Sequence, residues 1–340
     1  MKFDSVAAQK RRAQYANLRD KVWLENEFLR AWLVADPEVM SDILRAPDMA
    51  LPGIERMVSH IEQRSGKSLS NLRRAANMIP IMRSGETHAS LRRALAVYLM
   101  EKAKAAENVL PPMISTFLKR FQIKNSVDVH HDVVEPIIQQ FISFLVGKPV
   151  PPEILGLRLD LILNHSKSPS LVMELDRSFA IAIRFLEHDS KDELDLACKI
   201  CCITFGAETL IMMLVESILY AVEIAGDGPA YLPDFPHETG VPLTWRLATK
   251  DISVGGCPVR VGDMVKLRLQ AAAYSDKPEI QNLIFGAGPH SCIGKNVSLV
   301  LWEHFSFAFN ALQLHAKSGA YDAIVEPHMI RYRTAEIKIR

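Results

Sequence analysis

Apolar residues recur at helical spacing over most of the chain. Four stretches carry this pattern clearly enough to predict helices, at residues 86–104, 133–146, 192–223 and 295–314. Strand-like alternation is confined to short pieces. The sequence ISVGGCPVRVGDMVKLRL, residues 252–269, predicts a hairpin with Gly-Gly and Val-Gly-Asp turns, and MIRYRTAEIKIR, residues 329–340, predicts another strand pair. Many helices with small, separate sheets indicate a mostly α fold of the α+β class.

The composition favours one large folded domain. The chain has 340 residues, of which 49% are hydrophobic and 23% charged, enough to fill a sizeable core. No segment rich in Gly, Ser and Pro separates two parts, so we expect a single domain over residues 1–340. The prolines at 111–112 and at 149, 151 and 152 are interpreted as helix breaks within that domain.

Charge and targeting signals point to no nucleic acid and no membrane. The formal net charge is +1, the first residues are polar, and no run of about 18 apolar residues occurs. We therefore expect a cytoplasmic protein. Five cysteines, an odd number, argue against a disulfide framework; they are Cys198, Cys201, Cys202, Cys257 and Cys292.

One cysteine lies in a glycine-rich loop, FGAGPHSCIG, at residues 285–294. The glycines allow tight turns and close approach of backbone N–H groups. A predicted helix follows Cys292, and its positive dipole end favours a thiolate. One thiolate cannot close a zinc site, but a planar cofactor that brings four ligands of its own needs only one axial donor.

This loop resembles the haem-binding loop of the cytochrome P450 family. The matching residues are Phe285, Gly286, Gly288, His290, Cys292 and Gly294. The resemblance implies a cytochrome P450-like fold and haem b (iron protoporphyrin IX), with Cys292 as the axial thiolate. The simpler alternative is that Cys292 is only a small buried hydrophobic residue.

Further segments resemble the family in the family's order. The resemblance implies that His88 and Arg92, in SGETHASLRRALAVYLMEK, and Arg246, in WRLATKD, bind the haem propionates together with His290. At helical spacing His88 and Arg92 share one face. VDVHHDVVEPI resembles the next family segment, and we assign no chemical role to its two histidines, although His-His-Asp alone could suggest a metal.

The helix predicted at 192–223 contains FGAET, which resembles the oxygen-activating motif of the family. The resemblance implies that Thr209 helps to hold oxygen and that Glu208 relays protons. The alternative is a buried Glu and Thr satisfied by the helix backbone. Phe205 replaces a small residue of the family and could narrow the pocket. On the same helix Cys198, Cys201 and Cys202 share a face, which favours core packing over a metal site.

Two parts of the family pattern are missing. No Glu-x-x-Arg helix lies between Thr209 and Arg246, and the segment before the cysteine loop is short. The chain thus resembles a shortened bacterial-type member. The face where an electron donor docks is in question, although a basic patch could still bind an acidic ferredoxin; its candidates are Arg93, Lys102, Lys104 and Lys295. Residues 149–192 are short for the family's mobile lid, which implies a smaller or more open entrance.

The resemblance implies a haem-thiolate monooxygenase that oxidises a small or medium apolar molecule, such as a biosynthetic intermediate, with O₂ and a ferredoxin-type donor. Pocket positions carried over from the family are Phe205, Leu243, Thr244, Pro327 and His328. One alternative is a haem-dependent peroxygenase, isomerase or dehydratase without an external reductase. Another is a non-catalytic relative that recruits a partner or carrier protein.

Overall fold

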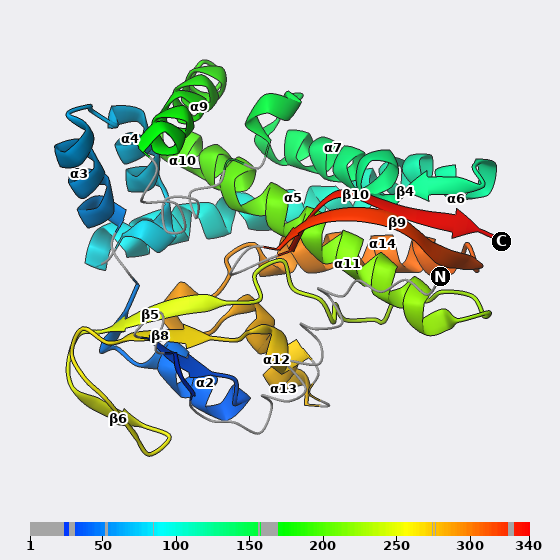
Figure 1. The fold of residues 1–340 in the computed structure, drawn as a ribbon. Coiled ribbons are helices and arrows are strands. Elements are labelled where there is room, and N and C mark those ends of the chain that lie inside the picture. The colour runs from blue at the N-terminus through cyan, green and yellow to red at the C-terminus, as the bar shows by residue number, and fades with distance from the viewer. Residues whose placement is uncertain are drawn as a thin grey trace.

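The computed structural model describes residues 24–26, 31–51, 54–83, 85–155, 157, 169–273, 275, 277–325 and 330–340. Helices make up most of this part of the chain. Helices α5, α7, α9, α10, α11 and α14 lie together on one side of the molecule, and a sheet containing β5 and β8 lies on the other with α2, α12 and α13 (Figure 1). The arrangement confirms the predicted mostly α fold with small segregated sheets.

The α-helices are distributed along the described part of the chain, from residue 37 to residue 310. Their bounds are α2 Pro37–Arg45, α3 Ile54–Ser65, α4 Ser70–Met78, α5 Gly85–Leu118, α6 Arg120–Ile123, α7 Glu135–Val146, α9 Pro169–Glu187, α10 Glu193–Cys201, α11 Ala207–Ala225, α12 Gln270–Ala273, α13 Pro278–Gln281 and α14 Lys295–Asn310. Of the two π-helical turns, η2 Val129–Val134 connects strand β4 to α7, and η4 Cys202–Gly206 connects α10 to α11. Short 3₁₀ turns are η1 Pro80–Met82, η3 Pro152–Ile154, η5 Asn282–Phe285 and η6 Gly288–His290.

The described strands form three small sheets. The largest has the order β1-β2-β8-β5-β3, the second β4-β10-β9, and the third is the β6-β7 hairpin. Within the first sheet β8 pairs parallel with β2 and antiparallel with β5. The bounds are β1 Leu24–Asn26, β2 Ala31–Val34, β3 Met49–Ala50, β4 Ser126–Asp128, β5 Thr244–Ala248, β6 Ile252–Val254, β7 Cys257–Val259, β8 Met264–Leu267, β9 Ala316–Val325 and β10 Ile330–Ile339.

The predicted hairpin is confirmed for β6 and β7, which turn at Gly255 and Gly256, both with positive φ. The prediction of a strand pair in residues 329–340 is wrong. This stretch forms the single strand β10, whose long partner is β9. It contains no Gly, Pro or Asn that could form a turn, so it continues as one strand.

The predicted helix break at Pro111 and Pro112 is also wrong, because both prolines lie inside α5. A proline within a helix costs about 3 kcal/mol. Leu110 and Ile114 beside them are fully buried, and burying each such side chain contributes about 2 kcal/mol. Packing against the core therefore holds the helix together across the two prolines.

Two groups of buried side chains form the core. The larger one joins the helices to β9 and β10, and α14 contributes Trp302, Phe305 and Phe309 to it. Their spacing of three and four places them on one helical face, as the periodicity predicted. The smaller group lies between α2 and the largest sheet and includes Met40, Ile43 and Val265.

One helix in the described part of the chain, Glu193–Ala225, meets the length and hydropathy criteria for a membrane span. Its most apolar window has a mean hydropathy of 1.8, but 72% of that window is buried inside the molecule. Packing within the core accounts for its apolar composition.

The absence of a Glu-x-x-Arg helix is confirmed. Residues 227–243 form neither helix nor strand. They run beside α14, where the Asn310 side chain exchanges two hydrogen bonds with the backbone of Leu232, and the Trp302 indole N–H donates to the carbonyl of Pro233. An irregular connection thus occupies this side of α14.

Candidate functional site

A cavity of about 290 Å³ lies between α5, α7, the α10–α11 helix and the cysteine loop. Its walls are mostly apolar, with few polar groups, as is usual for a site that binds an apolar molecule. Among the apolar lining residues are Ile79, Ile81, Leu95, Leu99, Phe141, Leu145, Leu210, Met213, Leu269, Ile284 and Val297. Cys292 borders this cavity.

Backbone conformation and close packing explain two of the glycines in the cysteine loop. Gly286 and Gly288 have φ of +70° and +67°, values that favour glycine. A Cβ at Gly288 would also lie 2.5 Å from the carbonyl oxygen of Leu44, so the loop packs directly on the end of α2. The Cys292 N–H donates to the Phe285 carbonyl at 2.7 Å and closes the loop.

The Cys292 sulfur lies at the start of α14, where the N–H groups of Gly294 and Lys295 donate to it. The side chain is exposed to the cavity, yet it is deep enough in the protein that burial raises its pKa. The two N–H groups and the charges of Arg92 and Lys295 lower the pKa but do not outweigh burial. The N–H groups at the start of α14 thus favour a thiolate, as expected from the sequence, but burial opposes them more strongly. A bound cation would favour the deprotonated form.

The four predicted propionate partners gather at one edge of the cavity. The rings of His88 and His290 lie with their centroids 4.5 Å apart. Arg92 donates to the carbonyl and hydroxyl of Ser291 at 2.9 and 3.3 Å. Arg246 is 2% exposed and donates to the Trp245 carbonyl. His88, Arg92 and Arg246 all lie close enough to His290 to lower its pKa.

This basic cluster has no acidic partner in the part of the chain that the structure describes. Burial and the three neighbouring basic groups lower the pKa of His290 to about 4, and burial lowers that of Arg246 to about 10. His88 Nε2 and His290 Nδ1 are buried without a hydrogen-bond partner. Buried polar atoms and charges are costly unless they are paired. The cluster therefore fits an anionic group, and the two propionates of haem b match its charge and its position beside Cys292.

The α10–α11 helix passes the cavity at its π-helical turn, as π-turns often do at functional sites. Phe205 and Thr209 line the cavity, and the Thr209 hydroxyl donates to the Phe205 carbonyl at 2.6 Å. Glu208 is not among the lining residues. Its carboxylate accepts from Arg331 of β10 at 2.6 Å, with 17% of its side chain exposed.

The remaining predicted pocket residues divide into three groups. Thr244 lines the cavity, as Phe205 does, and Leu243 is half-buried but does not line it. Pro327 and His328 lie outside the described residues.

Sequence reasoning missed part of the cavity wall. Glu238, Thr239, Gly240 and Val241 line the cavity from the connection after α11. A Cβ at Gly240 would lie 2.0 Å from the Thr209 carbonyl oxygen, so only glycine lets this connection reach the helix. A glycine in an otherwise irregular segment was the only signal in the sequence.

The three clustered cysteines are core residues, as predicted. Cys198, Cys201 and Cys202 are buried, and burial raises the pKa of Cys198 and Cys202 to about 12. No disulfide joins any two of the five cysteines, all of which lie in described parts of the chain.

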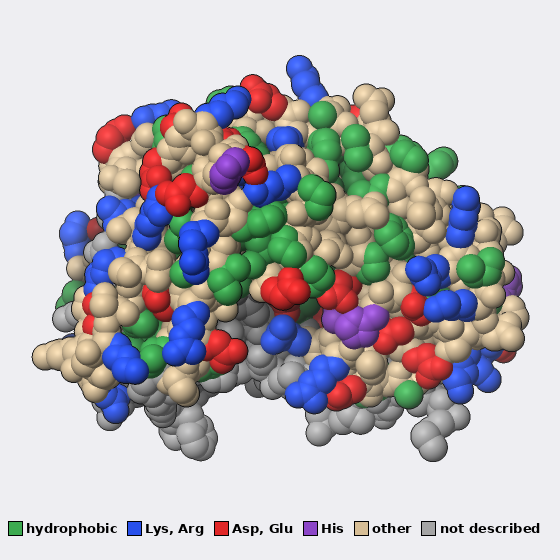
Figure 2. Space-filling model, turned by 90° about the horizontal axis from the view of Figure 1, so that it is seen from above, with side chains coloured by type: hydrophobic (Ala, Val, Ile, Leu, Met, Phe, Trp, Pro, Cys, Tyr) green, Lys and Arg blue, Asp and Glu red, His purple; other side chains and the backbone are tan. Residues whose placement is uncertain are grey.

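Charged side chains of both signs are interspersed on the face shown in Figure 2, in keeping with the net charge of +1. The basic residues considered for a ferredoxin are not equivalent. Arg93 pairs with Glu86 at the surface, whereas the Lys102 ammonium donates to the Phe144 carbonyl and lies over the rings of Tyr98 and Phe144. Lys102 therefore serves packing between α5 and α7.

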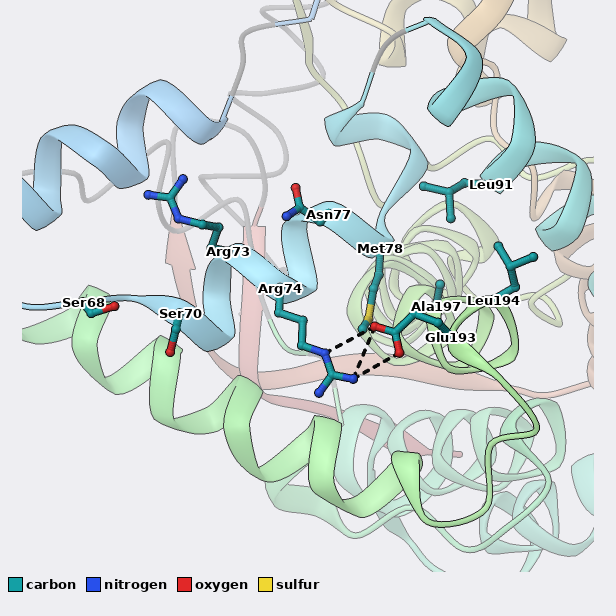
Figure 3. Close-up of a pocket in the computed structure, with 10 residues that line it drawn as sticks. All are labelled: Ser68, Ser70, Arg73, Arg74, Asn77, Met78, Leu91, Glu193, Leu194 and Ala197. Carbon is teal, nitrogen blue, oxygen red and sulfur yellow. Dashed lines mark hydrogen bonds and ion pairs between the residues drawn. The ribbon is translucent and has the colours of Figure 1, made fainter.

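A larger hollow of about 510 Å³ lies at the surface between α4 and α10 (Figure 3). Arg74 crosses it and pairs with Glu193, and also with Glu187. None of the predicted site residues lines it. Its charges are already paired, so it offers no reactive group comparable to Cys292.

Comparison with solved structures identifies the fold. The chain matches P450BioI, solved in complex with hexadec-9Z-enoic acid ligated acyl carrier protein, with a TM-score of 0.73 and 15% identity over 99% of this chain and 100% of that one. The chain has the cytochrome P450 fold. CYP164A2 of Mycobacterium smegmatis matches with a TM-score of 0.69 and 18% identity, over 99% of this chain and 98% of that one. CYP109E1 from Bacillus megaterium, solved in complex with testosterone, matches with a TM-score of 0.68 and 13% identity, over 96% of this chain and 97% of that one.

No family model matches the sequence, and no curated protein matches it either. The chain thus shares the cytochrome P450 fold with proteins that are only 13–18% identical to it, and comparison of sequences alone does not find this similarity. Its helices and sheets bring the cysteine loop, the basic cluster and the π-turn of α10–α11 around one cavity.

Proposed function

We propose that the protein is a haem-thiolate monooxygenase that oxidises a small or medium apolar substrate. The observation that carries this proposal is the placement of Cys292 at the N-terminus of α14, beside a buried basic cluster that has no acidic partner among the described residues. Such an arrangement suits a planar, dianionic cofactor with one protein ligand. Haem b would be held by Cys292 and by His88, Arg92, Arg246 and His290, and when bound it supplies the activation of O₂.

The residues of the chain would bind and orient the substrate and exclude water. The apolar wall formed by Leu95, Phe205, Leu210 and Val241 favours an apolar molecule. Thr209, in the first turn of α11, offers a hydroxyl that donates to the carbonyl of Phe205 in the π-turn. Glu208 is the proposed proton relay; because it is bound to Arg331, it would have to exchange that partner for water or for Thr209 during turnover.

The ligand assignment is tested by the absorption spectrum of the haem-loaded, reduced protein under carbon monoxide. A strongly red-shifted Soret band is expected for thiolate ligation, and Cys292→Ser should lose it. Cys257→Ser is the matched control, because Cys257 lies in the β6-β7 hairpin and does not line the cavity. A red-shifted band that persists in Cys292→Ser would show that another group is the ligand.

Apolar specificity can be tested with two molecules held by fold neighbours, hexadec-9Z-enoic acid and testosterone. Binding of either above the cofactor should shift the Soret band of the haem-loaded protein. Phe205→Ala should enlarge the site and change the relative affinity for the two probes. Unchanged affinities for both would place substrate elsewhere.

A peroxide-driven oxidase is the second candidate, and the missing helix favours it. Residues 227–243 form an irregular connection where the family resemblance implies a Glu-x-x-Arg helix. The loss of that helix would alter the face where the resemblance implies that a donor protein docks. Turnover of the same probes with hydrogen peroxide alone, compared with turnover with a ferredoxin and its reductase, separates the two. Product from peroxide only would replace the monooxygenase proposal.

A further inference from the structure

A cluster of potential metal ligands lies far from Cys292 in the chain, at the start of α7. One nitrogen each of His130 and His131 and one carboxylate oxygen of Glu135 all lie within 4.8 Å of one another. Two imidazoles and one carboxylate form a ligand set that zinc uses in proteins.

The π-helical turn η2 produces this cluster. In an α-helix, adjacent side chains point about 100° apart, so neighbouring histidines rarely face the same ion. Here the rings of His130 and His131 are stacked, with centroids 4.4 Å apart and planes tilted by 27°. Asp128 holds the turn, because its carboxylate accepts from the backbone N–H groups of both histidines at 3.0 and 3.2 Å.

The hydrogen bonds of His131 leave its Nδ1 available to bind a metal ion. His131 Nε2 lies 2.6 Å from the carbonyl oxygen of Arg333 on β10, to which it can donate. In the neutral ring, His131 Nδ1 then carries a lone pair and faces the Glu135 carboxylate at 2.7 Å. Two acceptors this close require a cation between them. A backbone carbonyl that orients the second nitrogen is also the usual support for a metal-bound histidine.

His130 distinguishes a metal ion from a proton. Its Nδ1 is buried without a hydrogen-bond partner. A proton between His131 and Glu135 would satisfy only those two groups, whereas a metal ion that also binds a ring nitrogen of His130 would engage all three residues. The neighbouring Asp132 does not compete, because Lys124 and Arg120 already pair with it. The site is accessible, with 51% of the His131 side chain and 37% of the Glu135 side chain exposed.

We propose that His130, His131 and Glu135 bind one Zn²⁺ ion, which links the start of α7 to strand β10 through the Arg333 carbonyl. Water completes the coordination shell, since three protein ligands leave a position open. Small rotations of the exposed His131 and Glu135 side chains bring the three atoms to zinc-ligand distance. The site is independent of the haem and of the proposed oxidation.

Equilibrium dialysis of the haem-loaded, metal-stripped protein against ZnCl₂ tests the proposal, with zinc measured by atomic emission. Wild type should bind one zinc per chain. His130→Gln, His131→Gln and Glu135→Gln should each weaken binding by at least about tenfold, because loss even of a group that only orients a metal ligand costs about 10–100-fold in affinity. His188→Gln and His315→Gln, which change exposed histidines elsewhere, should bind as wild type does.

Thermal unfolding gives a second readout. Zinc should raise the Tm of wild type and of both control variants, and MgCl₂ should not, because imidazole ligands favour zinc. The Glu135→Gln variant keeps the size of the side chain, so a folded variant with no zinc-dependent shift supports the site. Equal zinc binding by the three ligand variants and wild type would overturn the proposal, as would a wild type that binds no zinc.

Discussion

His88 and His290 show what single residues contribute to this site. Each keeps one buried ring nitrogen without a partner, although each has a partner ring 4.5 Å away. Imidazole, unlike guanidinium, can remain neutral when buried. The two rings can therefore lie beside the positively charged Arg92 and Arg246 without adding further charge. The basic cluster is therefore arranged to bind an anionic group and not to stabilise the fold by itself.

The titration of His290 predicts a pH dependence of the haem-free protein. Its folded pKa of about 4 lies below the value of 6.5 for an unperturbed histidine, so between these values the unfolded chain binds a proton that the folded chain does not. The free energy of unfolding should fall as pH decreases from 6.5 towards 4. Because the ring is only partly buried, we expect this site to account for about 1–2 kcal/mol of the loss.

Urea unfolding of the haem-free protein at several pH values in this window measures the effect. His290→Gln should flatten the pH profile, and the surface variant His188→Gln should leave it unchanged. A wild-type stability that rises as pH falls through the window would contradict the assignment.

At the scale of elements, a charged pair connects β10 to the α10–α11 helix. Arg331 of β10 pairs with the largely buried Glu208, while Arg333, two residues further, pairs with Asp322 at the surface. Removing a partner from a buried carboxylate costs more than removing one from an exposed carboxylate.

The two arginines therefore form a matched test. Arg331→Gln should lower the free energy of unfolding by about 1–2 kcal/mol, whereas Arg333→Gln should change it by no more than about 0.5 kcal/mol. Chemical denaturation of the haem-loaded variants measures both. Equal effects would mean that the Glu208 pair contributes no more than a surface pair.

Helix α5 continues across two prolines because its buried face is needed by the core. Leu110 is fully buried, and the adjacent Val109 is 37% exposed. Leu110→Ala should cost about 2–4 kcal/mol, since it creates a cavity, and Val109→Ala should cost less than about 1 kcal/mol. Thermal or urea unfolding gives the comparison; a small loss for Leu110→Ala would show that α5 is not held by this packing.

At the scale of the whole molecule, the connection after α11 forms part of the cavity wall. It lies along α14 and reaches α11 at Gly240, where a Cβ would overlap the Thr209 carbonyl. A short connection can take this route because it packs on the helices that remain and satisfies its backbone with Asn310 and Trp302.

Gly240→Ala should push the connection away from α11 and open the cavity wall. We expect faster loss of haem, measured by transfer to an excess of apomyoglobin, and a stability loss of about 1–3 kcal/mol. Gly228→Ala is the control in the same connection, because its added Cβ would lie 3.3 Å from the nearest backbone atom. Haem loss at the wild-type rate in Gly240→Ala would show that the contact does not shape the site.

The sequence by itself determined the helices that contain the site and the residues most closely tied to it. Periodicity predicted α14 because its buried residues repeat every three or four positions, and the glycine spacing marked the cysteine loop because positive φ restricts residue choice. Only the tertiary structure decided how distant groups meet. In the folded protein α5 continues through its two prolines, and β10 pairs with β9. Glu208 pairs with Arg331, and the ring of His130 stacks on that of His131. These outcomes depend on packing and pairing between segments far apart in the chain, which local patterns do not record.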